Sequence, residues 1–406
     1  MKKNRKNKKI ICSFTAILLI SLCTVFLLSL HGSLVVKAED SGEVSAGTTD
    51  EALEESIREQ LEQLDLEALR EYLASLGDFS DESIEERLIA YIQGTDFDYE
   101  NFWKELGNVF FAKVSEILPS FAIIAAVTLL AGLISAMKSS KGGQTSGEMI
   151  FLITYAAALI PLIGVLTECF SQAKNGISAM REQMQIVYPL MLTLMAASGG
   201  TVSASVCRPA VAFFGTTIVS VIDTVVFPLT ITIIVLSMAG NLTKELKIGK
   251  FTAFFKSINK WIIGICVSVF GIFFTLQGIT TATYDGVVRR AAKYAIGNGI
   301  PIVGGFLSGG FDLAVAGSVL IKNSLGSMSI FLMLSVLFEP LILLISVNML
   351  LRLVAAITQP FVDSRISDFL GETAENLHYC TAGLLFTAFL YFLSIVLMIY
   401  STEALF

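Results

Sequence analysis

The sequence predicts an all-α, polytopic helical membrane protein, and three observations support this fold class. Hydrophobic residues make up 54% of the 406-residue chain and charged residues only 16%, whereas a soluble domain has about 25% charged residues. Apolar runs of about 20 residues recur from residue 118 onward, which is long enough to cross a bilayer as a helix. Charge is also divided unevenly along the chain, which separates an N-terminal acidic segment from a membrane-embedded remainder.

Residues 1–38 have the features of a secretory signal peptide. Six Lys and Arg residues lie within the first nine positions, and an apolar stretch follows from Ile10 to Leu30. Small residues at Val36 and Ala38 occupy the −3 and −1 positions of a cleavage site, so we expect cleavage after Ala38. An uncleaved signal anchor is the alternative, because the apolar stretch is longer than the core of a usual signal peptide.

The acidic segment, residues 39–105, is expected outside the cytoplasm because it follows the signal peptide. It holds 21 acidic and 4 basic residues, whereas residues 106–406 hold 14 acidic and 17 basic residues. The phosphate backbone of nucleic acid would repel such a segment, which excludes nucleic acid as its partner. Apolar residues at helical spacing predict a helix between a capping box at Thr48 and a stop at Gly77. These residues are Leu53, Ile57, Leu61, Leu64, Ala68, Tyr72 and Leu76.

Two roles are open for the acidic segment, in which a second helix is expected to start at Ser80. In one, it forms a small helical hairpin with a solvated acidic face. In the other, it is a docking element, and its apolar stripe contacts an extracytoplasmic partner. A region this small can bury only a limited core of its own, which leaves the docking role open.

The remainder of the chain repeats an order of features rather than a sequence. Apolar helices are expected to begin near Pro119, Pro228 and Pro340, and each is followed by a polar stretch and a second apolar helix. This order predicts about two and a half tandem membrane repeats. Their expected ranges are 106–227, 228–339 and, truncated, 340–406.

Basic residues predict how these repeats cross the membrane. The polar stretch of the second unit has five lysines between Lys244 and Lys260, and that of the first has Lys138 and Lys141. Lys and Arg enrichment marks cytoplasmic loops, so we expect these stretches inside. Each unit then crosses an even number of times, and the repeats are parallel rather than inverted.

Two Ser-Gly-Gly sequences interrupt apolar regions where helices are expected. Glycine allows the left-handed backbone angles and close chain approach that a reversal needs, and exposed backbone at membrane depth requires a cover of protein or water. We therefore expect two hairpins that meet in the protein interior and face a cavity; the alternative is that these glycines only let helices pack closely. Asp312 and Lys322 could point toward the same polar path, or could be a structural ion pair or snorkelling side chains. The hairpin and cavity candidates are Ser198, Gly199, Gly200, Ser308, Gly309, Gly310, Asp312 and Lys322.

The sequence predicts neither an enzyme nor a cofactor. It contains no Ser/His/Asp constellation, no Walker loop and no metal triad, and its six cysteines and two histidines have no ligand spacing. A permease would therefore need an ion gradient or a partner as its energy source.

The stretch YDGVVRRAAKYAIGNGIPIVGGFLSGGFDLAVAGSVLIKNSLG, residues 284–326, resembles the stage III sporulation protein AE family. So does the order of signal peptide, acidic helical segment and polytopic remainder. The resemblance implies a multi-pass protein of the mother-cell membrane around the forespore. It also implies partners, which are the other stage III A operon proteins and stage II protein Q, and assigns no catalytic residues.

Two functional hypotheses follow. The first is a membrane core subunit of a transenvelope channel or secretion-like complex that links mother cell and forespore and is needed for late forespore development. The second is an autonomous small-molecule transporter or permease whose paired broken-helix hairpins line the path.

Overall fold

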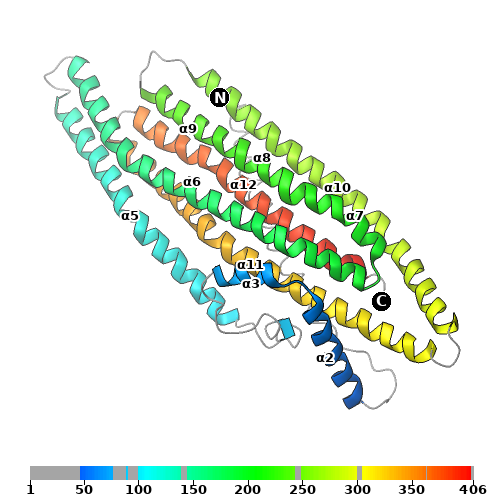
Figure 1. Ribbon diagram of the computed structural model, residues 1–406. Coiled ribbons are helices and arrows are strands. Elements are labelled where there is room, and N and C mark those ends of the chain that lie inside the picture. Colours follow the sequence, from blue (N-terminus) through cyan, green and yellow to red (C-terminus); the bar gives the residue numbers. More distant parts are fainter. Residues whose placement is uncertain are drawn as a thin grey trace.

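A computed structural model describes residues 46–75, 88–89, 99–138, 144–242, 248–299, 304–362 and 364–403, and every regular element in these ranges is helical (Figure 1). Ala38, the rest of the predicted signal peptide and the predicted helix start at Ser80 lie outside them. Two π-helical stretches, η1 (Phe213–Ile218) and η2 (Ile222–Val226), interrupt the helix that runs from α7 to α9. The α-helices are α2 (Ala46–Gln63), α3 (Glu67–Ser75), α5 (Tyr99–Lys138), α6 (Gln144–Ala197), α7 (Thr201–Ala212), α8 (Val219–Val221), α9 (Phe227–Leu242), α10 (Gly249–Gly299), α11 (Gly304–Thr358) and α12 (Ser364–Glu403).

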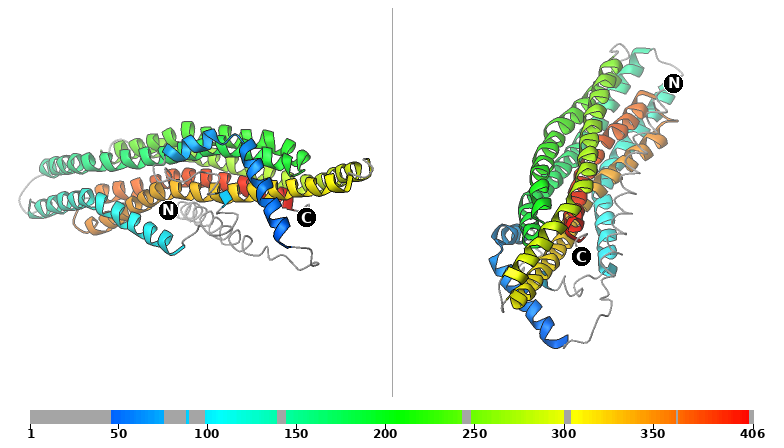
Figure 2. Two further views of the ribbon diagram at one scale, coloured as in Figure 1. Left: turned by 60° about the horizontal axis from the view of Figure 1, so that its bottom comes forward. Right: turned by 90° about the vertical axis from the view of Figure 1, so that its right-hand side faces the viewer.

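Six of the described helices are long and apolar enough to cross a membrane, as expected for a multi-pass membrane protein. They are α5, α6, the continuous run α7–α9, α10, α11 and α12. Each packs against the next one in the chain, and α12 lies in the middle, where it contacts α6, α9, α10 and α11 (Figures 1 and 2). The result is an elongated bundle of neighbouring helices.

The helices are much longer than a bilayer is thick. α6 has 54 residues and α11 has 55, which corresponds to about 80 Å at 1.5 Å per residue. The hydrocarbon core of a bilayer is only about 30 Å thick. Only part of each helix can therefore lie in lipid, and the rest has to be covered by protein or water.

Exposed side chains mark the part that suits lipid, which we call the apolar belt. On α6 the large exposed apolar side chains lie between Met149 and Ile163, and on α11 between Ile345 and Ile357. Exposed apolar side chains at the same end of the other helices complete this surface. They include Leu118, Ile123, Leu130 and Leu133 on α5, Ile231 and Val235 on α9, and Phe251, Trp261, Ile265 and Ile272 on α10.

Beyond the apolar belt the same helices continue with a different surface, and we call this part the distal half. Between residues 164 and 197 of α6 no large apolar side chain is exposed. The first half of α11, from Gly310 to Pro340, likewise exposes only small or polar residues, and α7 exposes a mixture. The exposed residues in this part of α6 include Thr167, Glu168, Ser171, Lys174, Asn175, Glu182 and Gln185.

The prolines expected to open new helices lie inside continuous ones. Pro119 is within α5 and Pro340 is within α11, and α6 contains two further prolines. Neighbouring helices and Ser/Thr side chains can satisfy the backbone groups that proline frees, so a packed membrane helix tolerates it. The repeat boundaries at 228 and 340 therefore fall within continuous helices, and the division into repeats stays a prediction.

The first Ser-Gly-Gly sequence ends α6 and reverses the chain. Gly199 has φ 90°, a left-handed value that favours glycine. The Gly200 N–H donates to the Met195 carbonyl at 2.9 Å and the Gly199 N–H to the Ala196 carbonyl at 3.1 Å, which is a Schellman motif. The buried Ser198 hydroxyl also donates to the Met195 carbonyl, at 2.9 Å, so the Met195 and Ala196 carbonyls near the end of α6 accept hydrogen bonds.

The prediction of a second break at Ser308, Gly309 and Gly310 is wrong, because all three lie inside α11. The preceding helix, α10, ends at Gly299 and α11 begins at Gly304, so the chain changes helix before it reaches the Ser-Gly-Gly sequence. A glycine pair needs no left-handed angle when nothing ends the helix around it. Among the described residues, a Ser-Gly-Gly sequence therefore forms a turn only between α6 and α7.

We expect alanine to have opposite effects at the two sequences. Gly199→Ala places a Cβ at positive φ and should destabilise the protein by about 1 kcal/mol. Gly310→Ala adds a better helix former where no atom lies within 4 Å, and should stabilise by up to about 1 kcal/mol. Thermal unfolding in detergent tests this, and equal shifts of both variants would contradict the assigned backbone conformations.

Cysteine labelling should separate the apolar belt from the distal half. Single cysteines at Ser171 and Gln185, which are exposed in the distal half, should react with an impermeant maleimide added to intact cells. A cysteine at Ile160, which is 76% exposed within the belt, should stay unlabelled because lipid covers it. If the cysteine at position 160 reacts and the cysteine at position 171 does not, the membrane surrounds the distal half instead, and the assignment of the apolar belt is wrong.

Candidate functional site

The acidic segment packs against the distal half of the bundle. α2 contacts α11, and α3 contacts α6 (Figure 1). The predicted single helix is broken between Gln63 and Glu67, where the Asp65 carboxylate accepts a long hydrogen bond of 3.4 Å from the Glu67 N–H. Its apolar side chains join the main core rather than a core of their own. Those buried among the described residues are Ile57, Leu61, Leu66, Leu69, Tyr72, Leu73 and Leu88.

Hydrogen bonds fix the position of α2 on α11. Gln60 Nε2 donates to the Ala314 carbonyl at 3.0 Å, and the Ser318 hydroxyl donates to Gln60 Oε1 at 2.7 Å. Gly317 lies beneath this contact, where an added Cβ would come within 2.9 Å of Gln60 Nε2. A glycine at this point therefore lets the two helices approach closely.

A second contact holds α3 on α6. The buried side chain of Gln183 donates from Nε2 to the Tyr72 hydroxyl at 2.8 Å and to the Leu332 carbonyl at 3.2 Å, which links α3, α6 and α11. Burial raises the pKa of Tyr72; the hydrogen bond from Gln183 opposes this rise and the nearby Glu182 carboxylate adds to it. The phenol is therefore neutral at physiological pH.

These contacts change the interpretation of the apolar stripe. Its central residues, Ile57, Leu61 and Tyr72, are covered by the protein's own bundle and are unavailable to a partner. The opposite face of α2 and α3 remains exposed and is acidic. Its exposed charged residues are Glu54, Glu55, Arg58, Glu59, Glu62, Asp65, Glu67, Arg70 and Glu71.

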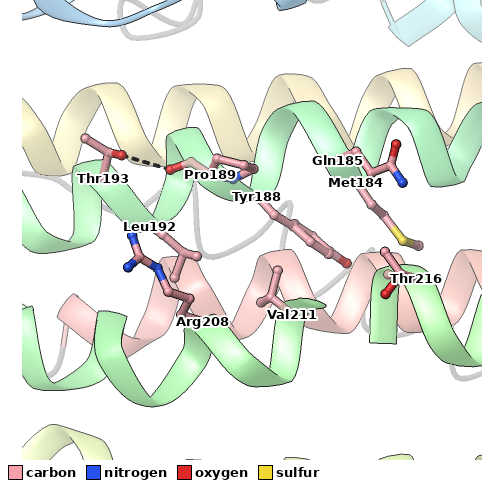
Figure 3. A pocket seen from close by; sticks show the side chains of 10 residues that line it. Met184, Gln185, Tyr188, Pro189, Leu192, Thr193, Arg208, Val211 and Thr216 are labelled. Carbon is pink, nitrogen blue, oxygen red and sulfur yellow. Dashed lines mark hydrogen bonds between the residues drawn. The ribbon is translucent and has the colours of Figure 1, made fainter. Parts of the chain in front are cut away.

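A cavity of about 370 Å³ lies between the two arms of the α6–α7 hairpin. α6 and the helix of α7 and η1 face one another across it, and Figure 3 shows Tyr188 lying across this space between them. Gly215, in η1, allows the close approach, because a Cβ there would lie 3.3 Å from the Tyr188 ring. The lining residues are Met184, Gln185, Tyr188, Pro189, Leu192, Thr193, Arg208, Val211, Gly215 and Thr216.

The chemistry of this hairpin cavity suits binding rather than catalysis. Its walls are mostly apolar, and Arg208 adds a guanidinium at the α7 side (Figure 3). Gln185, Thr193 and Thr216 add neutral hydrogen-bonding groups, and no acid or histidine is among the described residues that line the cavity. Such a site holds an apolar group with an acceptor or a negative charge beside it.

A larger cavity, about 800 Å³, lies on the other side of α6, and we call it the acidic groove. The C-terminal end of α2, the 64–66 connection and α3 form one wall, and α6 forms the other. Gln185, Pro189 and Thr193 line both cavities. Pro189 has no N–H to donate to the Gln185 carbonyl, and the Thr193 hydroxyl donates to the Pro189 carbonyl at 3.0 Å. The residues that line the acidic groove are Gln63, Leu64, Asp65, Ala68, Glu71, Tyr72, Glu182, Gln185, Ile186, Pro189, Leu190 and Thr193.

The two candidate charges of α11 have separate surroundings. Lys322 is fully buried, and its Nζ donates to the Ile399 carbonyl at 2.7 Å, in the second-last turn of α12. A cation near a helix C-terminus is favourable, which accounts for this lysine as a structural group. Asp312 is half-buried near the start of α11. Neither residue lines the two cavities, so a role in a polar path stays a prediction.

The sequence interpretation missed a set of polar side chains on the first half of α12, within the apolar belt. Glu372 accepts hydrogen bonds from the Ser237 hydroxyl and, at 3.3 Å, from Asn241 Nδ2. Nη2 of Arg352 lies 2.8 Å from His378 Nε2. The only sequence signal for these side chains was the run of ionisable residues from Arg365 to His378. From sequence alone, such a run is more typical of a polar connection than of a membrane helix.

Asn376 lies on the same face of α12 as Glu372, one turn further along. It is fully buried, and neither of its side-chain polar atoms has a hydrogen-bond partner among the described residues. Polar side chains inside a membrane protein are costly and are often functional. The belt therefore has a polar interior beneath its apolar surface.

Comparison with known proteins identifies the family. The model of the stage III sporulation protein AE family matches residues 83–402. The "Stage III sporulation protein AE" of Bacillus subtilis (strain 168) is 24% identical over 328 residues, which are 80% of this chain and 82% of that protein. No solved structure matches the chain. Since the family model covers most of the sequence, including the six membrane-length spans found among the described residues, this chain belongs to the stage III sporulation protein AE family.

Proposed function

We propose that the protein is the membrane core subunit of the sporulation complex that links mother cell and forespore. Membership of the family implies a role in sporulation. The observation that carries the more specific proposal is the distal half, in which the helices continue beyond the apolar belt. From Glu168 to Ala197, α6 alone extends for 30 residues, or about 45 Å.

The distal half has the properties of an assembly platform. Its helices pack against the acidic segment and against the apolar half of α12 in one apolar core. It offers an acidic outer face and two cavities, whereas a protein that needed only to stay in the membrane would need none of these. The resemblance to the family supplies the candidate partners, which are the other stage III A operon proteins and stage II protein Q, and the mother-cell membrane as the location.

Detaching the acidic segment should abolish assembly without preventing insertion. Leu61→Asp buries a charge between α2 and α11, where Leu61 is 2% exposed, and should release α2. Glu62→Asp, at the exposed neighbouring position, is the matched control. We expect normal membrane levels for both variants, protease sensitivity near residue 60 for Leu61→Asp alone, and loss of stage III A partners in pull-downs from sporulating cells.

The control outcomes decide the proposal. Wild-type protein and Glu62→Asp should retain the partners equally. If wild-type protein purifies without any stage III A protein under mild detergent, the core-subunit function is wrong. If Leu61→Asp releases α2 but keeps the partners, the acidic segment has no role in assembly.

The polar interior of the belt favours a second candidate function, an autonomous transporter. Glu372 has two hydrogen-bond donors, and Asn376 has no side-chain hydrogen-bond partner among the described residues; both lie between the helices of the apolar belt. Buried polar groups of this kind mark substrate and ion paths in many membrane proteins.

This second function predicts flux by the purified protein alone. Liposomes that contain it should release potassium or a small fluorescent anion, and Glu372→Gln should lower the rate at least tenfold. Thr381→Val, a buried α12 control outside the Glu372 contacts, should retain the rate. If liposomes that contain the wild-type protein release neither solute, the protein is not an autonomous transporter, and any transport requires the assembled complex.

A further inference from the structure

We propose that the acidic groove binds a cationic, amphipathic segment of a partner protein on the distal side of the membrane. The inference rests on the proposed function, since the segment would belong to another member of the complex. It names the surface and the chemistry by which that member is held. Three features of the groove support it: its charge, its floor and its shape.

The charge of the groove is negative and uncompensated. Asp65, Glu71 and Glu182 line it from three different elements, and all three are exposed. No lysine or arginine is among the described residues that line it, and none of the three carboxylates forms an ion pair with a described residue. A positively charged ligand would therefore meet complementary charge on both walls.

The floor of the groove is apolar. Leu64 and Ala68 lie on the wall formed by the acidic segment, and Ile186 and Leu190 lie opposite them on α6. Ile186 and Leu190 are separated by one helical turn of α6, whereas Leu64 lies in the 64–66 connection and Ala68 lies in α3. Apolar side chains therefore line the groove from both walls. A ligand with an apolar side and a charged side would cover this floor and pair with the carboxylates at the edge.

The groove does not suit a metal ion or a small polycation. Among the described residues, no group of three or more Asp, Glu, His or Cys side chains could hold a metal ion. A linear polyamine would pair with the carboxylates but would leave the exposed Ala68 and the half-buried Leu64 and Ile186 uncovered. A volume of about 800 Å³ has room for several side chains of a peptide.

The test uses the full-length protein in nanodiscs and a defined probe. The probe is a fluorescent heptapeptide, Lys-Ala-Leu-Lys-Ala-Leu-Lys, with empty nanodiscs subtracted, and binding is followed by anisotropy. We expect saturable binding that weakens as salt is raised. A matched peptide with glutamate in place of lysine should not bind.

Two pairs of variants separate the groove from general electrostatics. Glu71→Gln with Glu182→Gln should weaken binding about fivefold, the loss expected for two exposed ion pairs. Glu55→Gln with Glu59→Gln removes the same charge from the exposed face of α2, outside the groove, and should have no effect. Ala68→Trp fills the groove and should abolish binding at any salt, whereas Ala74→Trp, exposed on the same helix but outside the groove, should not.

The outcomes distinguish this inference from the proposed function. Equal weakening by the two glutamine pairs, equal effects of the two tryptophans, or binding of the glutamate peptide would overturn it. So would retention of the stage III A partners by Ala68→Trp and by the Glu71/Glu182 double variant in sporulating cells. In that case the core-subunit function still stands, and it fails only if wild-type protein purifies alone.

Discussion

The structure depends on one constraint, which is that apolar helix faces leaving the lipid still have to be covered. The two longest helices, α6 and α11, are each about 80 Å long, more than twice the thickness of a bilayer core. Along the distal half, protein therefore replaces lipid as the apolar surroundings. α12 supplies the centre of this core, with Leu384, Tyr391 and Ile395 among its fully buried side chains. α6, α11 and the acidic segment close around it.

Apolar burial, rather than hydrogen bonding, holds the acidic segment in place. Burying an apolar side chain contributes about 1.5–3 kcal/mol, and seven such side chains are buried among the described residues of the acidic segment. A hydrogen bond contributes only about 1 kcal/mol, and four such bonds between described residues link the segment to α6 and α11. Burial thus supplies most of the attraction, while Gln60 and Gln183 determine where along α11 and α6 the segment sits.

The sequence was sufficient to predict the fold class and much of the apolar stripe, but not the break within it. Ile57, Leu61 and Tyr72 are buried as the helical spacing predicts, whereas Ala68 is exposed. The reason is the interruption between Gln63 and Glu67, which rotates α3 relative to α2. An argument from periodicity assumes an unbroken helix. The local signal that a second helix, α3, begins here was Asp65, whose carboxylate accepts a hydrogen bond from the Glu67 N–H.

The identical Ser-Gly-Gly sequences had different outcomes because glycine permits a reversal without requiring one. At Gly199 the last carbonyls of α6 complete a Schellman motif, whereas Gly309 lies five residues inside α11. The polar half of α12 was missed for a related reason. Hydropathy detects apolar runs whether lipid or protein covers them. The apolar half of α12 was therefore predicted as a membrane helix although it lies in the distal half, and the polar half within the belt was not.

The two π-helical stretches have a consequence for how this family can vary. A π-helical turn holds one residue more than the α-helical turn that it replaces, so η1 and η2 take up extra length locally. They lie where the hairpin arm passes from the distal half to the belt, and Asp223 of η2 is 3.9 Å from Lys174 of α6. A single-residue insertion or deletion between Phe213 and Val226 can be absorbed there. The turn at Gly199 and the lipid-facing α9 then keep their places, and the two halves of the molecule can diverge in sequence length independently of one another.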